Sequence, residues 1–188
     1  VRSRRQRQMC IRDRVWCYDR DILTIAAERI GNEELTEDTI NDLNYKRNDV
    51  ASAGITGVMG MGNIPIYNQM FLEQAKIIRK LANYGSAVFL GRCADYILKD
   101  IKNCTSVYLY ADREFRKNRV KEIYGSNAEI MDKEEKNRAD YYNYYTGNRW
   151  GDINNYDFAI NTSKVSFEEA ADLIYRFAKD KQKNLKDR

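Results

Sequence analysis

One stretch of the sequence, VFLGRCADYIL, has a composition and spacing suited to phosphate binding. An apolar run of the strand type leads into Gly91 and Arg92, and a helical pattern follows. Open α/β sheets bind ligands at the carboxyl ends of their strands, where an arginine beside helix N-terminal amides can hold a phosphate through two hydrogen bonds. The alternative is an arginine that begins a helix and pairs with a surface carboxylate such as Asp95.

A second stretch, DREFRKNRVKEIYG, places further arginines just after a predicted strand. Arg116 and Arg119 lie three residues apart and therefore share one face of the predicted helix. In a phosphotransferase, such a face neutralises the charge of the phosphate in transfer. The commoner explanation of a charged helix face is simple exposure to solvent, and the spacing leaves both explanations open.

A third stretch, IMDKEEKNRADYYNYYTGNRWGD, carries charged residues at three-residue spacing. The residues Asp132, Glu135 and Arg138 are predicted to form one polar stripe on a helix. The next turns are surrounded by four tyrosines: Tyr141, Tyr142, Tyr144 and Tyr145. We interpret these as packing residues, because a platform for single-stranded nucleic acid also needs a basic groove beside its aromatic rings.

The glycine-rich sequence GITGVMGMGN is a poor match to a phosphate-binding loop. It lacks the Gly-Lys-Ser/Thr ending, in which the lysine reaches the phosphates and the hydroxyl reaches the metal. No convincing strand precedes it either. We interpret this sequence as a flexible connector.

The residue types that are missing narrow the chemistry further. The chain has no histidine, which excludes the common Ser-His and Cys-His nucleophilic systems. Its four cysteines show no CxxC spacing, so we predict no metal ligands and no disulfide framework. No apolar run approaches the roughly 20 residues that span a bilayer, and no signal peptide is evident, so a cytoplasmic location is predicted.

The first 14 residues look foreign to the rest of the chain. The sequence RRQRQMCIRDR, from Arg4 to Arg14, matches residue for residue a translated transposase-type sequencing adapter. A basic arm that binds nucleic acid is the alternative, but the segment has no helical periodicity, aromatic residue or lysine. Residues 1–14 hold six arginines and one aspartate, and without them the formal net charge changes from +4 to −1. The charge argument for a nucleic-acid partner then disappears, and we exclude residues 1–14 from the predicted domain.

From residue 15 onward, short apolar runs alternate with amphipathic stretches, as in a parallel sheet wrapped by helices. Strands are predicted at 15–18, 86–91, 105–111 and 156–161, and those at 86–91 and 105–111 have the composition of buried strands. Helices are predicted at about 19–31, 36–50, 66–83, 92–99, 112–124, 128–145 and 166–180. Residues 32–64 form a polar insertion, which is either a mobile substrate-covering subdomain or an ordinary surface excursion.

Local signals predict where several helices begin and end. Asp19 is the expected N-cap of the first helix and Gly31 its stop. Ser166 and Glu169 have the spacing of a capping box at the start of the last helix. The lysine-rich sequence KDKQKNLKDR is interpreted as a frayed, solvated helix terminus.

Five segments together resemble the cytidylate kinase-like family, which is related to the P-loop nucleoside monophosphate kinases. They are YDRDILTIAAE, VFLGRCADYIL, VYLYADREFRKNRV, DKEEKNRADYYNYYTGNRWGD and NYDFAINTS, in register from about Trp16 to Lys179. The resemblance implies an α/β domain over 15–188 with a doubly wound parallel sheet. It also implies a helical substrate-binding insertion at about 32–64 and a lid at about 116–150. Relatives begin with a strand and a glycine-rich phosphate loop, which we expect this chain to lack because the adapter-like segment stands in their place.

The resemblance also implies roles for individual residues, by position in these motifs. The implied catalytic residues are Arg92 and Arg138. The implied substrate-binding residues are Asp19, Gly91, Arg92, Asp95 and Glu135, and the implied ATP-binding lid residues are Arg116, Arg119 and Arg138. The sequence Asn161-Thr162-Ser163 matches the strand-end motif that follows the lid.

Two positions depart from cytidylate kinases: Cys93 stands where they have an aspartate, and Met131 stands where their lid has another arginine. The implied function of the complete protein is phosphoryl transfer from ATP, with Mg²⁺, to a nucleoside monophosphate, preferably cytidylate. Nucleic acid and membrane partners are not expected. Without a phosphate loop, the chain itself is expected to be inactive or nearly so. The two departures suggest an alternative, a catalytically silent nucleotide-binding regulatory or interaction module of the same fold.

Overall fold

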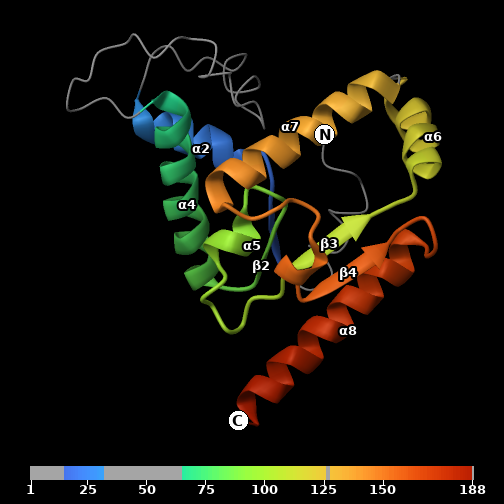
Figure 1. Ribbon diagram of the computed structural model, residues 1–188. Coiled ribbons are helices and arrows are strands. Elements are labelled where there is room, and N and C mark those ends of the chain that lie inside the picture. The colour runs from blue at the N-terminus through green and yellow to red at the C-terminus, as the bar shows by residue number, and fades with distance from the viewer. Residues whose placement is uncertain (1–14, 32–64, 126–127, 188) are drawn as a thin grey trace. The chain divides into compact units, whose positions relative to one another are not determined.

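A computed structural model describes residues 15–31, 65–125 and 128–187 of the chain. The chain divides into two compact units, Val1–Ala94 and Asp95–Arg188, and each unit is described by itself (Figure 1). The adapter-like segment, the insertion at 32–64 with its predicted helix, and the glycine-rich sequence within it lie outside the described residues. The structure does not test the predictions made for these segments.

The first unit contains two parallel strands joined by a helical crossover. Strand β1 (Trp16–Tyr18) pairs with β2 (Ala87–Phe89), with Tyr18 opposite Phe89. Parallel strands need a long connection, and this one includes helices α2 (Asp21–Ile30) and α4 (Ile66–Tyr84), which pack against each other. The core consists of their buried apolar residues: Ile22, Leu23, Ala26, Ala27, Met70, Ala75, Ile77 and Ile78.

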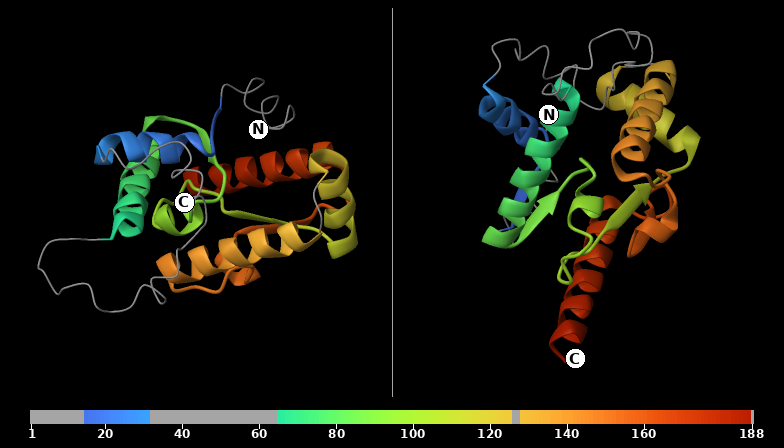
Figure 2. Two further views of the ribbon diagram at one scale, coloured as in Figure 1. Left: turned by 90° about the horizontal axis from the view of Figure 1, so that it is seen from above. Right: turned by 60° about the vertical axis from the view of Figure 1, so that its left-hand side comes forward.

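The second unit repeats this plan with another parallel pair. Strand β3 (Val107–Tyr110) pairs with β4 (Phe158–Asn161), and the crossover between them contains α6 (Arg113–Tyr124), α7 (Ala128–Thr146) and the 3₁₀ helix η1 (Ile153–Asn155). Helix α8 (Phe167–Lys186) follows β4 (Figure 2). Phe177 of α8 stacks on Phe158 of β4 with ring centroids 4.9 Å apart. A single-turn helix, α5 (Ala94–Ile97), spans the sequence boundary between the units.

The α/β class is confirmed, and all four predicted strands form parallel pairs. The capping box of α8 is present, with the Ser166 hydroxyl accepting from the Glu169 amide at 3.2 Å and the Glu169 carboxylate accepting from the Ser166 amide at 2.8 Å. Gly31 ends α2 in the left-handed conformation, as predicted. The single doubly wound sheet stays a prediction.

Two predicted helix starts are wrong. The N-cap of α2 is Arg20 rather than Asp19, and no side chain caps this helix; the Asp19 carbonyl instead accepts a turn hydrogen bond from the Ile22 amide. The helix predicted at 92–99 is reduced to Ala94–Ile97. The reason is that Arg92 and Cys93 have positive φ angles, which a right-handed helix cannot contain.

Two further predictions fail at the surface of the second unit. Leu109 and Tyr110 of β3 are 54% and 44% exposed, so this strand is not of the buried type. Among the described residues β3 pairs only with β4. Helix α8 continues to Lys186, beyond its predicted end at about residue 180, and Lys183 and Lys186 in its last turn suit the negative end of the helix dipole.

Candidate functional site

The most unusual backbone of the described chain follows β2. Gly91, Arg92 and Cys93 have φ angles of 67°, 60° and 54°, three left-handed residues in succession. The left-handed conformation costs roughly 1–2 kcal/mol for each non-glycine residue, and such strain clusters at functional sites. The Arg92 side chain is only 2% exposed and Cys93 only 3%. Arg92 is therefore buried, and it precedes α5 rather than beginning it.

The end of β1 lies beside this turn. The Leu90 amide donates to the Tyr18 carbonyl at 2.9 Å, and the Tyr18 and Phe89 rings stack with centroids 5.4 Å apart. Because β1 and β2 are parallel, Asp19 and the turn at Gly91 follow their strands at the same edge of this sheet. The structure thus brings Asp19, Gly91 and Arg92 to one edge of the first unit.

Asp95 is held by a tyrosine of the second unit. Tyr142 of α7 is 5% exposed, and its hydroxyl donates to Asp95 Oδ2 at 2.6 Å. Burial raises the pKa of Asp95, and the hydrogen bond from Tyr142 opposes this rise. Burial also raises the pKa of Tyr142, as does the bond to Asp95. Tyr142 therefore stays a neutral donor to this carboxylate.

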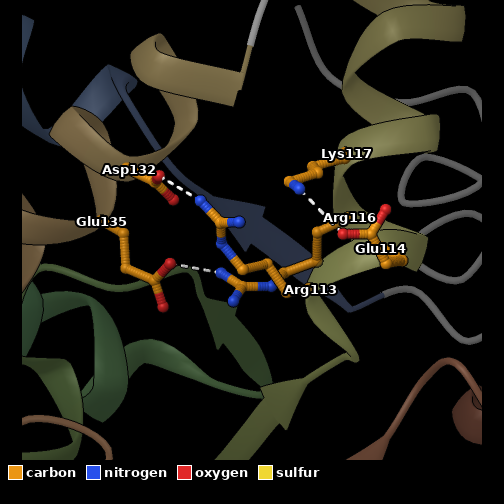
Figure 3. Close-up of polar contacts among 6 residues, drawn as sticks. All are labelled: Arg113, Glu114, Arg116, Lys117, Asp132 and Glu135. Atoms are coloured by element: carbon orange, nitrogen blue, oxygen red, sulfur yellow. Dashed lines mark hydrogen bonds and ion pairs between the residues drawn. The ribbon is translucent and has the colours of Figure 1, made fainter.

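The charged residues of α6 and α7 pair across the two helices (Figure 3). Arg113 donates to Asp132 at 2.5 Å, and Arg116 forms an ion pair with Glu135. The two arginines are three residues apart on α6, and their carboxylate partners are three residues apart on α7. The Arg116–Glu135 pair is half-buried, with each side chain 32% exposed. The predicted stripe on α7 thus faces a matching stripe of arginines on α6.

Arg116 and Arg119 do not come together, although their spacing placed them on one helix face. The Arg119 guanidinium lies over the ring of Phe167 at the start of α8, 4.2 Å from its centroid. Such a cation–π contact is a stable position for an arginine. Arg138 lies on α7, three residues after Glu135, with an exposed side chain.

The carboxyl ends of β3 and β4 carry a second polar cluster. The exposed carboxylate of Asp112 accepts hydrogen bonds from Lys164 at 3.0 Å and from Asn161 at 3.2 Å, and the Asp112 amide donates to Ser163 Oγ at 3.1 Å. The hydrogen bonds from Lys164, Asn161 and Ser163 lower the pKa of Asp112. The motif Asn161-Thr162-Ser163 therefore organises the edge at which the second sheet could meet a ligand.

The described residues contain no group of three or more His, Cys, Asp or Glu side chains that could hold a metal ion. None of the described helices has the length and apolar character needed to cross a membrane.

The sequence matches the cytidylate kinase-like family over residues 13–164, which is more than half of the chain. The chain belongs to this family. Membership indicates a nucleotide kinase, that is, a transferase that binds nucleotides, and kinases of this kind generally use ATP and Mg²⁺.

A solved structure supports the fold of this cytidylate kinase-like chain. The crystal structure of an uncharacterized protein from Eubacterium ventriosum ATCC 27560 superposes with a TM-score of 0.64 at 24% sequence identity. The match covers 92% of this chain and 88% of that one, and at this identity it concerns the fold alone. No curated protein matches the chain significantly.

Sequence reasoning missed several partners in this member of the family. The ion pair of Arg113, the hydrogen bond between Tyr142 and Asp95, and the role of Lys164 at the strand ends were not predicted. One signal was available for the first of these, because Arg113 and Arg116 repeat the three-residue step of Asp132 and Glu135. Tyr142 is 47 residues from Asp95 in the sequence and Lys164 is 52 residues from Asp112, so no local pattern marks either contact.

Proposed function

We propose that the complete protein is a nucleoside monophosphate kinase that transfers a phosphoryl group from ATP, preferably to cytidylate. The observation that carries this proposal is the turn after β2, where the Arg92 guanidinium is buried on a strained left-handed backbone. In a chain of the cytidylate kinase-like family, a buried arginine at the carboxyl end of a parallel strand suits the acceptor phosphate.

The acceptor side of the proposed site consists of Asp19, Gly91, Arg92, Asp95 and Glu135. Arg92 would orient the acceptor phosphate through paired hydrogen bonds, and the carboxylates would accept hydrogen bonds from hydroxyl or amino groups of the nucleoside. Phosphoryl transfer requires little covalent participation from the protein, so positioning and charge stabilisation account for most of the rate. No protein nucleophile is needed in this mechanism.

The donor side would use the lid arginines Arg116, Arg119 and Arg138. Their guanidinium groups would stabilise charge that spreads over the transferred group, and Arg138, with Arg92, is proposed as catalytic. In the structure Arg116 is paired with Glu135 and Arg119 lies over Phe167. Binding of the donor phosphates would therefore require these arginines to exchange partners.

We also propose that the chain follows the doubly wound fold of the P-loop kinase relatives. On this proposal residues 15–188 form one kinase domain with an insertion at 32–64 and a lid at 116–150.

A second candidate function is a nucleotide-binding regulatory or interaction module without catalysis. Cys93 and Met131 favour it, because they replace an aspartate and an arginine of cytidylate kinases. Cys93 is buried beside Arg92, where a thiol cannot accept hydrogen bonds as a carboxylate does.

Substitution of Arg92 in the complete protein tests the assignment. Arg92→Ala is expected to weaken the use of CMP about 10- to 100-fold, as for the loss of hydrogen bonds to a charged group, and to leave ATP binding unchanged. Arg176→Ala, an exposed arginine of α8, is the control and should change neither. If CMP use and ATP binding both survive Arg92→Ala, the role assigned to Arg92 is wrong.

A further inference from the structure

We propose that Tyr142 is a positioning residue, whose hydroxyl holds the Asp95 carboxylate in the orientation in which it receives a donor group of the acceptor nucleotide. This inference rests on the proposed function and assigns a residue of α7 to the acceptor side of the site.

The hydrogen bond between these residues is short and fixed in place. Tyr142 Oη lies 2.6 Å from Asp95 Oδ2, and the tyrosine side chain is 5% exposed. The backbone of Tyr142 is also secured, because its carbonyl accepts from Thr146 Oγ1 at 2.7 Å and Thr146 Oγ1 in turn accepts from the Asn148 amide at 3.0 Å. A phenol held by packing in this way can aim its hydroxyl with little freedom.

Asp95 needs such a partner, because its own helix is too short to hold it. Helix α5 has only four residues, and a single isolated turn has almost no stability of its own. The residues just before it, Arg92 and Cys93, are in a strained conformation that the surrounding structure must maintain. A hydrogen bond from a long, packed helix supplies the restraint that α5 lacks.

Helix α7 carries both this hydrogen bond and the lid ion pair. Glu135 and Tyr142 are seven residues apart, which is two helical turns, so both lie on the same side of α7 about 10 Å apart. Glu135 pairs with Arg116 of α6, while Tyr142 pairs with Asp95 of α5. The same helix thus bonds to a lid arginine and to an acceptor carboxylate.

The electrostatics of Asp95 provide a readout that simple packing would not change. Burial raises the pKa of Asp95, while hydrogen bonds from Tyr142 and from backbone amides lower it. The neighbouring titratable groups are the thiol of Cys104, whose pKa responds to Asp95, and the phenol of Tyr156, which interacts with Tyr142. Removal of the Tyr142 hydroxyl therefore raises the pKa of Asp95 further, because the carboxylate loses a donor.

The test compares Tyr142→Phe with Tyr144→Phe in the full chain. Tyr144 is on the same helix and 50% exposed, so its substitution is a matched control. The Asp95 pKa is measured by ¹³C NMR of the carboxyl group, and CMP affinity is measured by calorimetry between pH 5 and pH 8. We expect Tyr142→Phe to raise the pKa of Asp95 and to weaken CMP binding about 5- to 10-fold, as for the loss of one hydrogen bond to a charged group. The pH dependence of CMP affinity should shift to higher pH.

A double-mutant cycle separates positioning from packing. In a chain that already carries Asp95→Asn, adding Tyr142→Phe should have little further effect on CMP affinity, because both substitutions act on the same contact. Additive losses would indicate packing and overturn the inference, as would equal CMP affinity for Tyr142→Phe and wild type at every pH. If wild type binds no nucleoside monophosphate, the proposed function fails and this inference fails with it.

Discussion

Arg116 of α6 is bound to Glu135 of α7, so the arginine proposed to meet the donor phosphates already has a carboxylate partner within the same helix pair. The Nε of Arg116 is buried and has no hydrogen-bond partner among the described residues, which leaves one donor of the guanidinium unused. The carboxylate and a phosphate compete for the same kind of hydrogen bond. On the proposed function, this ion pair is a resting state of the proposed lid, with Glu135 in the place of a phosphate oxygen.

Substitution of Glu135 should affect two ligands in opposite directions. Glu135→Gln is expected to raise the affinity for tripolyphosphate about three-fold or more, because a neutral amide competes less well for Arg116. The same substitution should weaken CMP binding, since Glu135 is assigned to the acceptor. Calorimetry with both ligands measures these effects, and Glu134→Gln is the control with the same change in charge. Equal or weaker tripolyphosphate binding by Glu135→Gln would contradict the resting-state interpretation.

Asp157 should stabilise the second unit through its contacts with α8 and with Ser106, the residue before β3. Its carboxylate accepts from Lys181 Nζ at 2.7 Å, from the Ser106 amide at 2.9 Å and from Ser106 Oγ at 3.2 Å. Asp157→Asn is expected to lower the free energy of unfolding in urea by about 1–2 kcal/mol. Asp180→Asn, an exposed residue of α8, should change it by less than about 0.5 kcal/mol. Equal effects of the two substitutions would show that the contacts of Asp157 contribute nothing.

The pH dependence of this effect has a defined sign. Burial raises the pKa of Asp157, but hydrogen bonds from Lys181 and Ser106 outweigh it and hold the pKa below its usual value of 3.8. A carboxylate with a lowered pKa contributes stability that is complete above its unfolded pKa and is lost as the pH falls through its folded pKa. The difference between wild type and Asp157→Asn should therefore stay constant from pH 7 to about pH 5 and shrink below about pH 4. A difference that grows on acidification would contradict this assignment.

Gly151 should tolerate a side chain less well than Gly147, although both are left-handed. Their φ angles are 77° and 71°, but a Cβ at Gly151 would lie 3.0 Å from Tyr108 Oη, whereas one at Gly147 meets nothing within 4 Å. The Tyr108 ring is held between Tyr156 and Trp150 and cannot easily move. Gly147→Ala should lower the free energy of unfolding by about 1–2 kcal/mol because of its left-handed backbone. Gly151→Ala should lower it by about 1 kcal/mol more because of the clash with Tyr108.

Removal of the Tyr108 hydroxyl identifies the source of that difference. In a Tyr108→Phe background, Gly151→Ala should cost no more than Gly147→Ala, as measured by thermal or urea unfolding. A persistent excess would mean that another contact, or the backbone itself, opposes the side chain at Gly151.

The strands and most helices could be predicted because each is marked by signals only a few residues long. Apolar runs identify the four strands, and Ser166 with Glu169 marks the start of α8. The turn after β2 could not be predicted in this way. Left-handed φ angles at Arg92 and Cys93 oppose the intrinsic preference of both residue types, so only tertiary contacts can impose them.

The pairings among the proposed site residues could not be predicted from the sequence. The three-residue spacing on α6 and α7 was visible, but which arginine meets which carboxylate depends on how the two helices cross. Arg119 shows the limit of the spacing argument, since it lies over Phe167 of α8 instead of beside Arg116. The bond from Tyr142 to Asp95 joins residues 47 positions apart and depends wholly on tertiary structure.

The kinase proposal is tested most directly by ³¹P NMR of the complete protein during incubation with ATP, Mg²⁺ and CMP. We expect CDP and ADP to appear in equal amounts. The same measurement is made with dCMP, UMP and AMP as acceptors, and UMP and AMP should be phosphorylated more slowly or not at all. Binding of nucleotides without a phosphorylated product from any of the four acceptors would contradict the proposal and favour the regulatory module.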